Sequence, residues 1–119
     1  MSDTILWAMQ SVLVLIFAPA AVVRAARYEF AKQRMAWVGA VPRPLLVFIS
    51  LAEIVGAAGL ILPGVLRADL GWTAAAALGL AAIQALALIF HLRRHEPRNA
   101  SANAVLAALL MCVAAGRLP

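Results

Sequence analysis

The chain has 119 residues, of which 66% are hydrophobic and only 13% are charged. Soluble domains are nearer half apolar and a quarter charged, so this composition disfavours a soluble enzyme, a nucleic-acid-binding domain and a disordered chain. The net charge of +5 comes from basic residues between long apolar runs, where lipid headgroups rather than nucleic acid are the expected partners. The single cysteine, Cys112, allows no intrachain disulfide and no two-cysteine metal or redox motif. The composition therefore indicates a membrane protein.

Four apolar runs follow one another along the chain, at residues 5–23, 45–62, 72–90 and 100–115. At a rise of about 1.5 Å per residue, each run is roughly long enough as a helix to cross the ~30 Å hydrocarbon core of a bilayer. The runs show no alternation of apolar and polar residues, and their alanine content favours helix over strand. The sequence therefore predicts one all-α domain over residues 1–119, an integral membrane bundle of four transmembrane helices with no soluble domain.

The connections contain turn residues and one further helix. Residues 25–37 hold no proline or glycine and are rich in helix formers, which predicts a short cytoplasmic helix lying partly in the membrane interface. Pro63 and Gly64 are expected to end the second long helix, and Pro19 to kink or interrupt the first. Asn99 is a candidate N-cap for the fourth.

The basic residues predict how the bundle is oriented. Five of them lie between residues 24 and 44 and three between residues 93 and 98, whereas the second connection and the C-terminus hold one each. Cytoplasmic loops are rich in Lys and Arg, so the first and third connections are expected in the cytoplasm and both termini outside it. Residues 18–20 resemble a signal-peptide cleavage site, but Asp3 and the absence of Lys or Arg before the first run favour an uncleaved helix.

Glu53 lies at the centre of the second run, with eight residues of that run before it and nine after it. A carboxyl group at the bilayer midplane is energetically expensive and is a functional hypothesis by default. At about 100° per residue, Ser50, Gly56 and Ala57 share its helix face, and small residues around a polar group are typical of a helix–helix interface. Two interpretations are open: a structural carboxyl bonded to a neighbouring helix, or a ligand, ion or proton site.

Gln84 and His91 lie seven residues apart on one face of the third run. With Glu53 they predict a polar seam from the midplane to the cytoplasmic side, in which Gln84 is the expected hydrogen-bond partner of Glu53. A plain interhelical hydrogen bond would explain Gln84 equally well, and contact with headgroups would explain His91. His91 and His95 are four residues apart, but no Glu or Cys completes a ligand set, so no metal site is expected.

Three further residues are candidate supports for this seam. Gln10 and Arg24 share a face of the first run, and Asn103 is expected to face the bundle from the fourth. Arg24 is expected near the cytoplasmic interface, and Gln10 either closes the outer side of the seam or makes a plain interhelical bond. Cys112 is expected to pack in the core.

Several spaced polar and small residues match a known family. They are Arg24 (where the family usually has lysine), residues 35–39, residues 51–63, residues 91–96, Asn103 and residues 116–117. On these residues the chain resembles the DoxX-like family of small four-helix membrane proteins, from about residue 17 to residue 117. The resemblance implies an integral membrane four-helix bundle. It implies no single activity, since relatives are linked to thiol and oxidative-stress complexes, to quinone-linked oxidoreductases and to receptor assembly or trafficking.

The leading interpretation is a non-enzymatic accessory or binding module with a polar intramembrane pocket around Glu53 and no catalytic residues. One alternative is a small proton-coupled transporter that acts as a dimer. Another is a subunit of a membrane oxidoreductase complex that binds quinone near His91, and quinone is the one cofactor that these interpretations involve. The expected partners are the lipid bilayer and, for an accessory protein, another membrane protein. Ala52–Gly56 and Ala75–Gly79 are small-residue pairs that allow close helix approach, within the bundle or in a homodimer.

Overall fold

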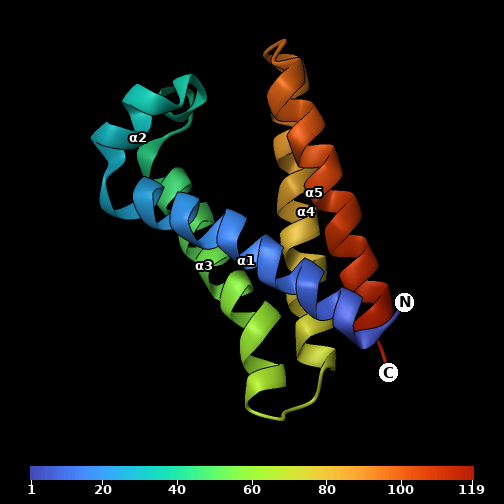
Figure 1. Cartoon of the computed structure of the whole chain (residues 1–119). Helices are drawn as coiled ribbons and strands as arrows, with labels where there is room; N and C mark the ends of the chain where they lie inside the picture. The colour runs from blue at the N-terminus through green and yellow to red at the C-terminus, as the bar shows by residue number, and fades with distance from the viewer.

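The computed structural model describes all residues 1–119 and contains helices but no strands. Four helices are long: α1 (Asp3–Ala26), α3 (Arg43–Val65), α4 (Gly71–Arg93) and α5 (Pro97–Arg117). A short helix α2 (Tyr28–Arg34) and a 3-10 helix η1 (Ala36–Ala40) connect α1 to α3 (Figure 1). Each long helix is apolar and long enough to cross a membrane. The prediction of an all-α bundle with four membrane spans is therefore confirmed.

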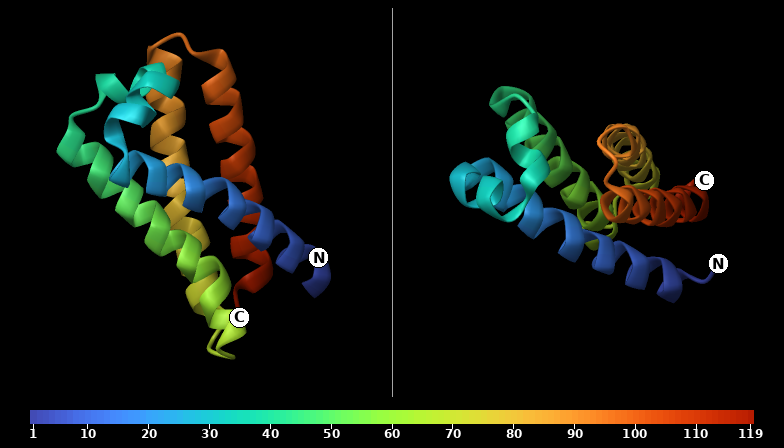
Figure 2. Two further views of the ribbon diagram at one scale, coloured as in Figure 1. Left: turned by 60° about the vertical axis from the view of Figure 1, so that its left-hand side comes forward. Right: turned by 90° about the horizontal axis from the view of Figure 1, so that it is seen from above.

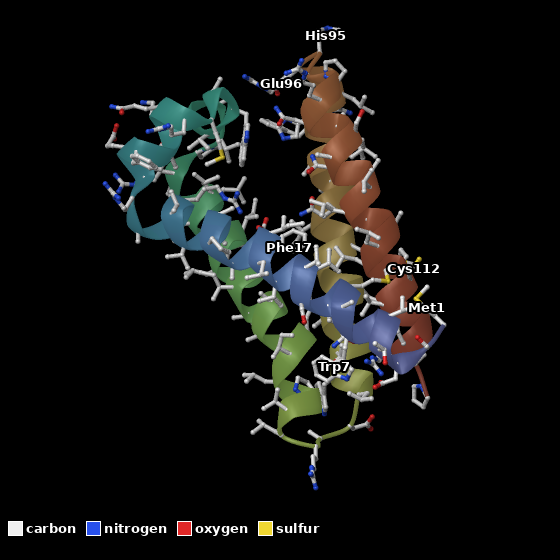
Figure 3. All side chains as sticks on the ribbon, viewed as in Figure 1. Met1, Trp7, Phe17, His95, Glu96 and Cys112 are labelled. Atoms are coloured by element: carbon white, nitrogen blue, oxygen red, sulfur yellow. The ribbon has the colours of Figure 1, made fainter.

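The four long helices form two antiparallel pairs, α1 with α3 and α4 with α5 (Figure 1). Packing of α3 on α4, and a smaller contact of α1 with α5, joins the pairs around an apolar core. Phe17, near the middle of α1, belongs to this core (Figure 3). Toward α2, α1 and α3 tilt away from α4 and α5 (Figures 1 and 2). The two pairs therefore meet closely at the end that carries both termini and diverge at the other.

Glycines allow α3 to approach α4 closely. A Cβ atom on Gly59 would lie 2.6 Å from the Cβ of Ala76, and one on Gly56 would lie 2.7 Å from the side chain of Leu80. A Cβ atom on Gly79, by contrast, would meet nothing within 4 Å. Of the two small-residue pairs that the sequence offers, the one containing Gly56 therefore serves the α3–α4 contact, while Gly79 lies outside it.

The helix ends differ from the predicted ones in several places. Helix α1 continues across Pro19 and α3 across Pro63; the carbonyl of Gly59 that Pro63 leaves free accepts from Oγ1 of Thr73 at 3.0 Å. Helix α5 begins at Pro97, whose missing N–H is not needed in a first turn, so the prediction of Asn99 as the N-cap is wrong. The single helix predicted over residues 25–37 is instead the pair α2 and η1.

Cys112 lies near the end of the bundle that also holds Met1 (Figure 3). Its side chain is exposed on the surface of α5, so the prediction that it packs in the core is wrong. The next two residues, Val113 and Ala114, occupy the buried face of the helix instead. Because the run is apolar on every side of the helix, the sequence did not show which of its residues face α4.

Candidate functional site

A cavity of about 370 Å³ lies between the two helix pairs, in the half of the bundle that carries η1. Fourteen of its 20 lining residues are hydrophobic. The lining residues are Ile16, Phe17, Ala20 and Arg24 of α1; Trp37, Ala40, Val41 and Pro42 of the connection; Leu45, Leu46, Ile49 and Glu53 of α3; Ile83, Gln84, Leu86, Ala87, Phe90 and His91 of α4; Asn103 and Leu106 of α5. The structure thus brings five of the polar residues singled out in the sequence to one cavity from four different helices.

Glu53 pairs with Arg24 inside the bundle. The Nη2 atom of Arg24 donates to Oε2 of Glu53 at 2.6 Å, and its Nε donates to Oγ of Ser50 at 3.3 Å. The side chains of Arg24 and Glu53 are only 9% and 8% exposed. The expectation that Gln84 is the partner of Glu53 is therefore wrong. The long side chain of Arg24 extends from the last turn of α1 to the adjacent helix α3 and reaches the carboxylate of Glu53. The position of Arg24 in its run, near the cytoplasmic interface, did not indicate this contact.

Three aromatic rings are packed edge to face at the cavity wall near this ion pair. Trp37 of η1 contacts His91 of α4 with ring centroids 5.4 Å apart, and Phe90 contacts both rings at 6.4 and 5.2 Å. The guanidinium carbon of Arg24 lies 5.7 Å from the centre of the Trp37 ring, within the range of a cation–π contact. Trp37 thus links the connecting segment to α1 and to α4.

His91 is held by the loop between α4 and α5. Its Nδ1 atom lies 2.9 Å from Oε1 of Glu96, and Nε of Arg94 donates to the same oxygen at 3.0 Å. These contacts, the His91 hydrogen bond first, hold the pKa of Glu96 below its ordinary value of 4.5. Glu96 and His95 lie beyond the ends of α4 and α5 (Figure 3), so His91 sits at the margin of the spanning region.

Two amide side chains face the cavity without a partner in the chain. The Nδ2 atom of Asn103 is buried and has no hydrogen-bond acceptor. Gln84 is 4% exposed, and its side chain makes no hydrogen bond within the protein. Hydrogen-bond donors that are both buried and unpaired are rare in folded proteins, and the chain has one other, Nη2 of Arg117, which lies outside the cavity.

A second group of buried polar residues lies at the other end of the bundle, outside the cavity. The Nε2 atom of Gln10 donates to the carbonyl oxygen of Leu60 at 2.6 Å, and its Oε1 accepts from Nε of Arg117 at 2.7 Å. Arg117 also donates from Nη1 to Oδ1 of Asp3 at 2.6 Å and lies over the ring of Trp7. Gln10 therefore makes interhelical bonds, as one of the two interpretations of this residue predicted, and contributes nothing to the cavity.

Reasoning from the sequence missed four residues of these two clusters. Ser50, Trp37 and Glu96 support Arg24 or His91, and Arg117 closes the bundle at the termini. Ser50 was seen as a small residue beside Glu53, and Arg117 lay just past the last apolar run. The available signal for Arg117 was its spacing of four and seven residues from Val113 and Leu110, which places it on their face of the helix. No group of three or more His, Cys, Asp or Glu side chains is arranged to hold a metal ion.

Four apolar helices around a cavity lined by apolar and polar groups define a small multi-pass membrane protein. The chain belongs to the DoxX-like family, whose sequence profile matches residues 8–113. The match includes every residue that lines the cavity. No curated protein and no solved structure matches the chain.

Proposed function

We propose that the chain is a non-enzymatic binding module of the membrane, which holds a small, largely apolar ligand in the cavity beside Glu53. The observation that carries this proposal is the buried Nδ2 atom of Asn103, which has no acceptor although it belongs to the wall of a cavity. An unpaired amide N–H in an apolar environment costs about 1–3 kcal/mol, and the bilayer interior supplies no water to pair it. A ligand oxygen that accepts from Asn103 would remove this cost.

The charges and the volume of the cavity restrict the ligand further. Arg24 and Glu53 neutralise each other at 2.6 Å, which favours a ligand without net charge. A volume of about 370 Å³ lies in the range of small-molecule pockets, and the mostly hydrophobic lining requires an apolar body. The expected ligand is therefore an uncharged amphiphile with at least one acceptor oxygen.

The same contacts bear on the two alternative functions. A quinone has an apolar ring and carbonyl oxygens, so it falls within the class of ligand that the cavity favours, near His91 and Asn103. A small proton-coupled transporter is less well supported, because the guanidinium of Arg24 already pairs with one oxygen of the Glu53 carboxylate and competes for it with a proton or a cationic cargo. Binding is thus favoured over coupled transport.

A cavity-filling substitution tests the proposal. Ala87 lines the cavity, and Ala82 lies exposed on the same helix, so Ala87→Phe and Ala82→Phe form a matched pair. Binding of 1-naphthol, an uncharged probe with an apolar ring and one oxygen, would be measured by equilibrium dialysis of the detergent-solubilised protein. We expect saturable binding by the parent and by Ala82→Phe, and loss of that binding in Ala87→Phe.

A polar-to-apolar substitution gives a second measurement. Asn103→Leu removes the donor and should weaken 1-naphthol binding about tenfold, the value of one hydrogen bond, whereas Ser101→Leu on the exposed face of α5 should not. Equal binding by the parent and Ala87→Phe would show that the probe partitions into detergent or onto the surface. The proposal would then be withdrawn.

We also propose that both termini face away from the cytoplasm, from the eight basic residues in the first and third connections against two elsewhere. A cysteine introduced at Ser2 should react with an impermeant maleimide added to intact cells, in a Cys112→Ser background. One introduced at Gln33, which is exposed on α2, should react only after lysis. The reverse pattern would refute this orientation.

A further inference from the structure

His91 is a buried polar side chain of which the protein uses only one edge. Its side chain is 6% exposed, its Nδ1 atom pairs with Glu96, and its ring lines the cavity. No group of the chain makes a hydrogen bond to its other nitrogen, Nε2, and this atom is not sealed from the surrounding space. His91 thus has an unpaired nitrogen beside the cavity. Neither the Arg24–Glu53 ion pair nor the amides of Gln84 and Asn103 form a hydrogen bond with it.

The contacts of Glu96 determine which ring nitrogen carries the proton. Nε of Arg94 donates to the same oxygen of Glu96 that Nδ1 of His91 approaches, at 3.0 and 2.9 Å. A carboxylate that receives a guanidinium donor is ionised and can only accept hydrogen bonds, so Nδ1 of His91 must be the donor. In the neutral imidazole, Nε2 then carries a lone pair and is an acceptor.

The cavity therefore offers an acceptor at His91 in addition to the donor at Asn103. Asn103 lies in the second turn of α5, and the antiparallel packing of α4 and α5 places it opposite the last turns of α4, between the levels of Gln84 and His91. An ether or carbonyl oxygen could satisfy the donor only. A hydroxyl group can both accept a hydrogen bond from one amide and donate its own proton to the imidazole.

Resting on the proposed function, we propose that the cavity selects a hydroxyl-bearing apolar molecule, whose O–H donates to Nε2 of His91, with Glu96 as the positioning residue that fixes the imidazole tautomer. The hydroxyl can be phenolic or aliphatic, since both supply the same donor. A ligand with the same skeleton but a methyl ether in place of the hydroxyl leaves Nε2 unpaired. The preference for a donor is what distinguishes this inference from the general proposal of an apolar binding site.

Two matched pairs of probes test the preference. They are 1-naphthol with 1-methoxynaphthalene, and 1-decanol with decyl methyl ether, each measured by competition or dialysis at pH 8 on the full chain in detergent. We expect the hydroxyl member to bind about tenfold more tightly than its ether, as one hydrogen bond implies. A preference in one pair only would identify whether the site accepts the phenolic or the aliphatic source of the hydroxyl.

Variants of the two residues test the mechanism. His91→Phe should bind both members of a pair equally, since the acceptor is lost while an aromatic ring remains. Glu96→Leu should lose most of the preference, whereas Glu96→Gln, whose amide oxygen still accepts from Nδ1, should keep it. Arg98→Gln, which changes a charge in the same part of the chain but forms no hydrogen bond or ion pair with either residue, is the control.

The tautomer can be read directly by ¹⁵N NMR of histidine-labelled protein. His95→Asn leaves His91 as the only histidine, and asparagine tolerates the positive φ of 58° at that position. We expect a protonated Nδ1 and an unprotonated Nε2, with the Nε2 resonance shifted by 1-naphthol and unchanged by 1-methoxynaphthalene.

The outcomes separate this inference from the one on which it rests. If the ethers bind as tightly as the alcohols, or if Nε2 is the protonated nitrogen, the hydroxyl preference is refuted while the binding module stands. If no probe of either pair binds, the proposed function fails and the preference fails with it.

Discussion

The ion pair between Arg24 and Glu53 provides the sharpest test of how this bundle is held together. The two side chains are 9% and 8% exposed and meet at 2.6 Å, so either one without the other would be a buried, unpaired charge. Removing one partner of such a pair costs about 3–5 kcal/mol, whereas removing both costs much less. We therefore expect Glu53→Leu and Arg24→Met each to lower the free energy of unfolding by about 3–5 kcal/mol, and the double variant to lose far less than their sum.

Reversible unfolding in mixed detergent micelles would measure all four proteins, and the coupling energy follows from the double-mutant cycle. Glu53→Gln separates charge from shape, since it keeps the acceptor for Arg24 but leaves the guanidinium without a counter-charge. Glu29→Gln, which changes an exposed glutamate of α2, should stay within about 0.5 kcal/mol of the parent. Additive effects of the single substitutions, or a loss below 1 kcal/mol in either, would contradict the buried pair.

Three other predictions concern packing, the end of the bundle that holds the termini, and pH. Gly59→Ala should destabilise the bundle by about 1–3 kcal/mol in the same unfolding assay, because its Cβ would lie 2.6 Å from the Cβ of Ala76. Gly79→Ala, with open space around the new Cβ, should be neutral or should stabilise the bundle by up to about 1 kcal/mol. Arg117→Met should cost about 2–3 kcal/mol, since it removes two charge-assisted hydrogen bonds and leaves a buried amide oxygen unpaired; thermal melts that match the parent would refute this. The hydrogen bond from His91 lowers the pKa of Glu96. The ionised Glu96 therefore contributes its full stabilisation above about pH 4.5, and this stabilisation is lost as the pH falls through the lowered pKa. Glu96→Gln should abolish this loss in unfolding curves recorded from about pH 7 to about pH 3.

The fold was largely predictable because the bilayer leaves few solutions for a chain of this composition. Four apolar runs must become helices, since every backbone N–H and C=O in a lipid environment has to be satisfied within its own segment. The exact ends were less predictable, because a proline that would break a helix in water can lie inside a membrane helix, as Pro19 and Pro63 do. The inward faces were also uncertain: in a run that is apolar all round, as at Cys112, periodicity does not mark the core.

Which residues line the site was easier to predict than which hydrogen bonds they form. The position of Glu53 at the centre of a run and the shared face of Gln84 and His91 place all three around one cavity. The pairing of Glu53 with Arg24 could not be read from depth along the sequence, because an arginine side chain is long enough to bridge several turns of helix and α1 is tilted against α3. The cavity itself follows from the divergence of the two helix pairs, which is a property of helix packing angles rather than of any local pattern.

Each end of the bundle holds one buried side-chain nitrogen without a partner, and the surroundings of the two nitrogens differ. Near the termini, Nη2 of Arg117 is unpaired, but the same guanidinium donates to Gln10 and Asp3 and lies over the ring of Trp7. Near η1, the Nδ2 atom of Asn103 has no partner at all, and Asn103 lines a cavity. An apolar wall would be more stable in lipid, since replacing unpaired polar groups by apolar ones of similar shape removes their desolvation cost. The amide donor of Asn103 lowers stability without bonding to the protein. A ligand oxygen in the cavity beside Glu53 would give this donor an acceptor and so explain its presence.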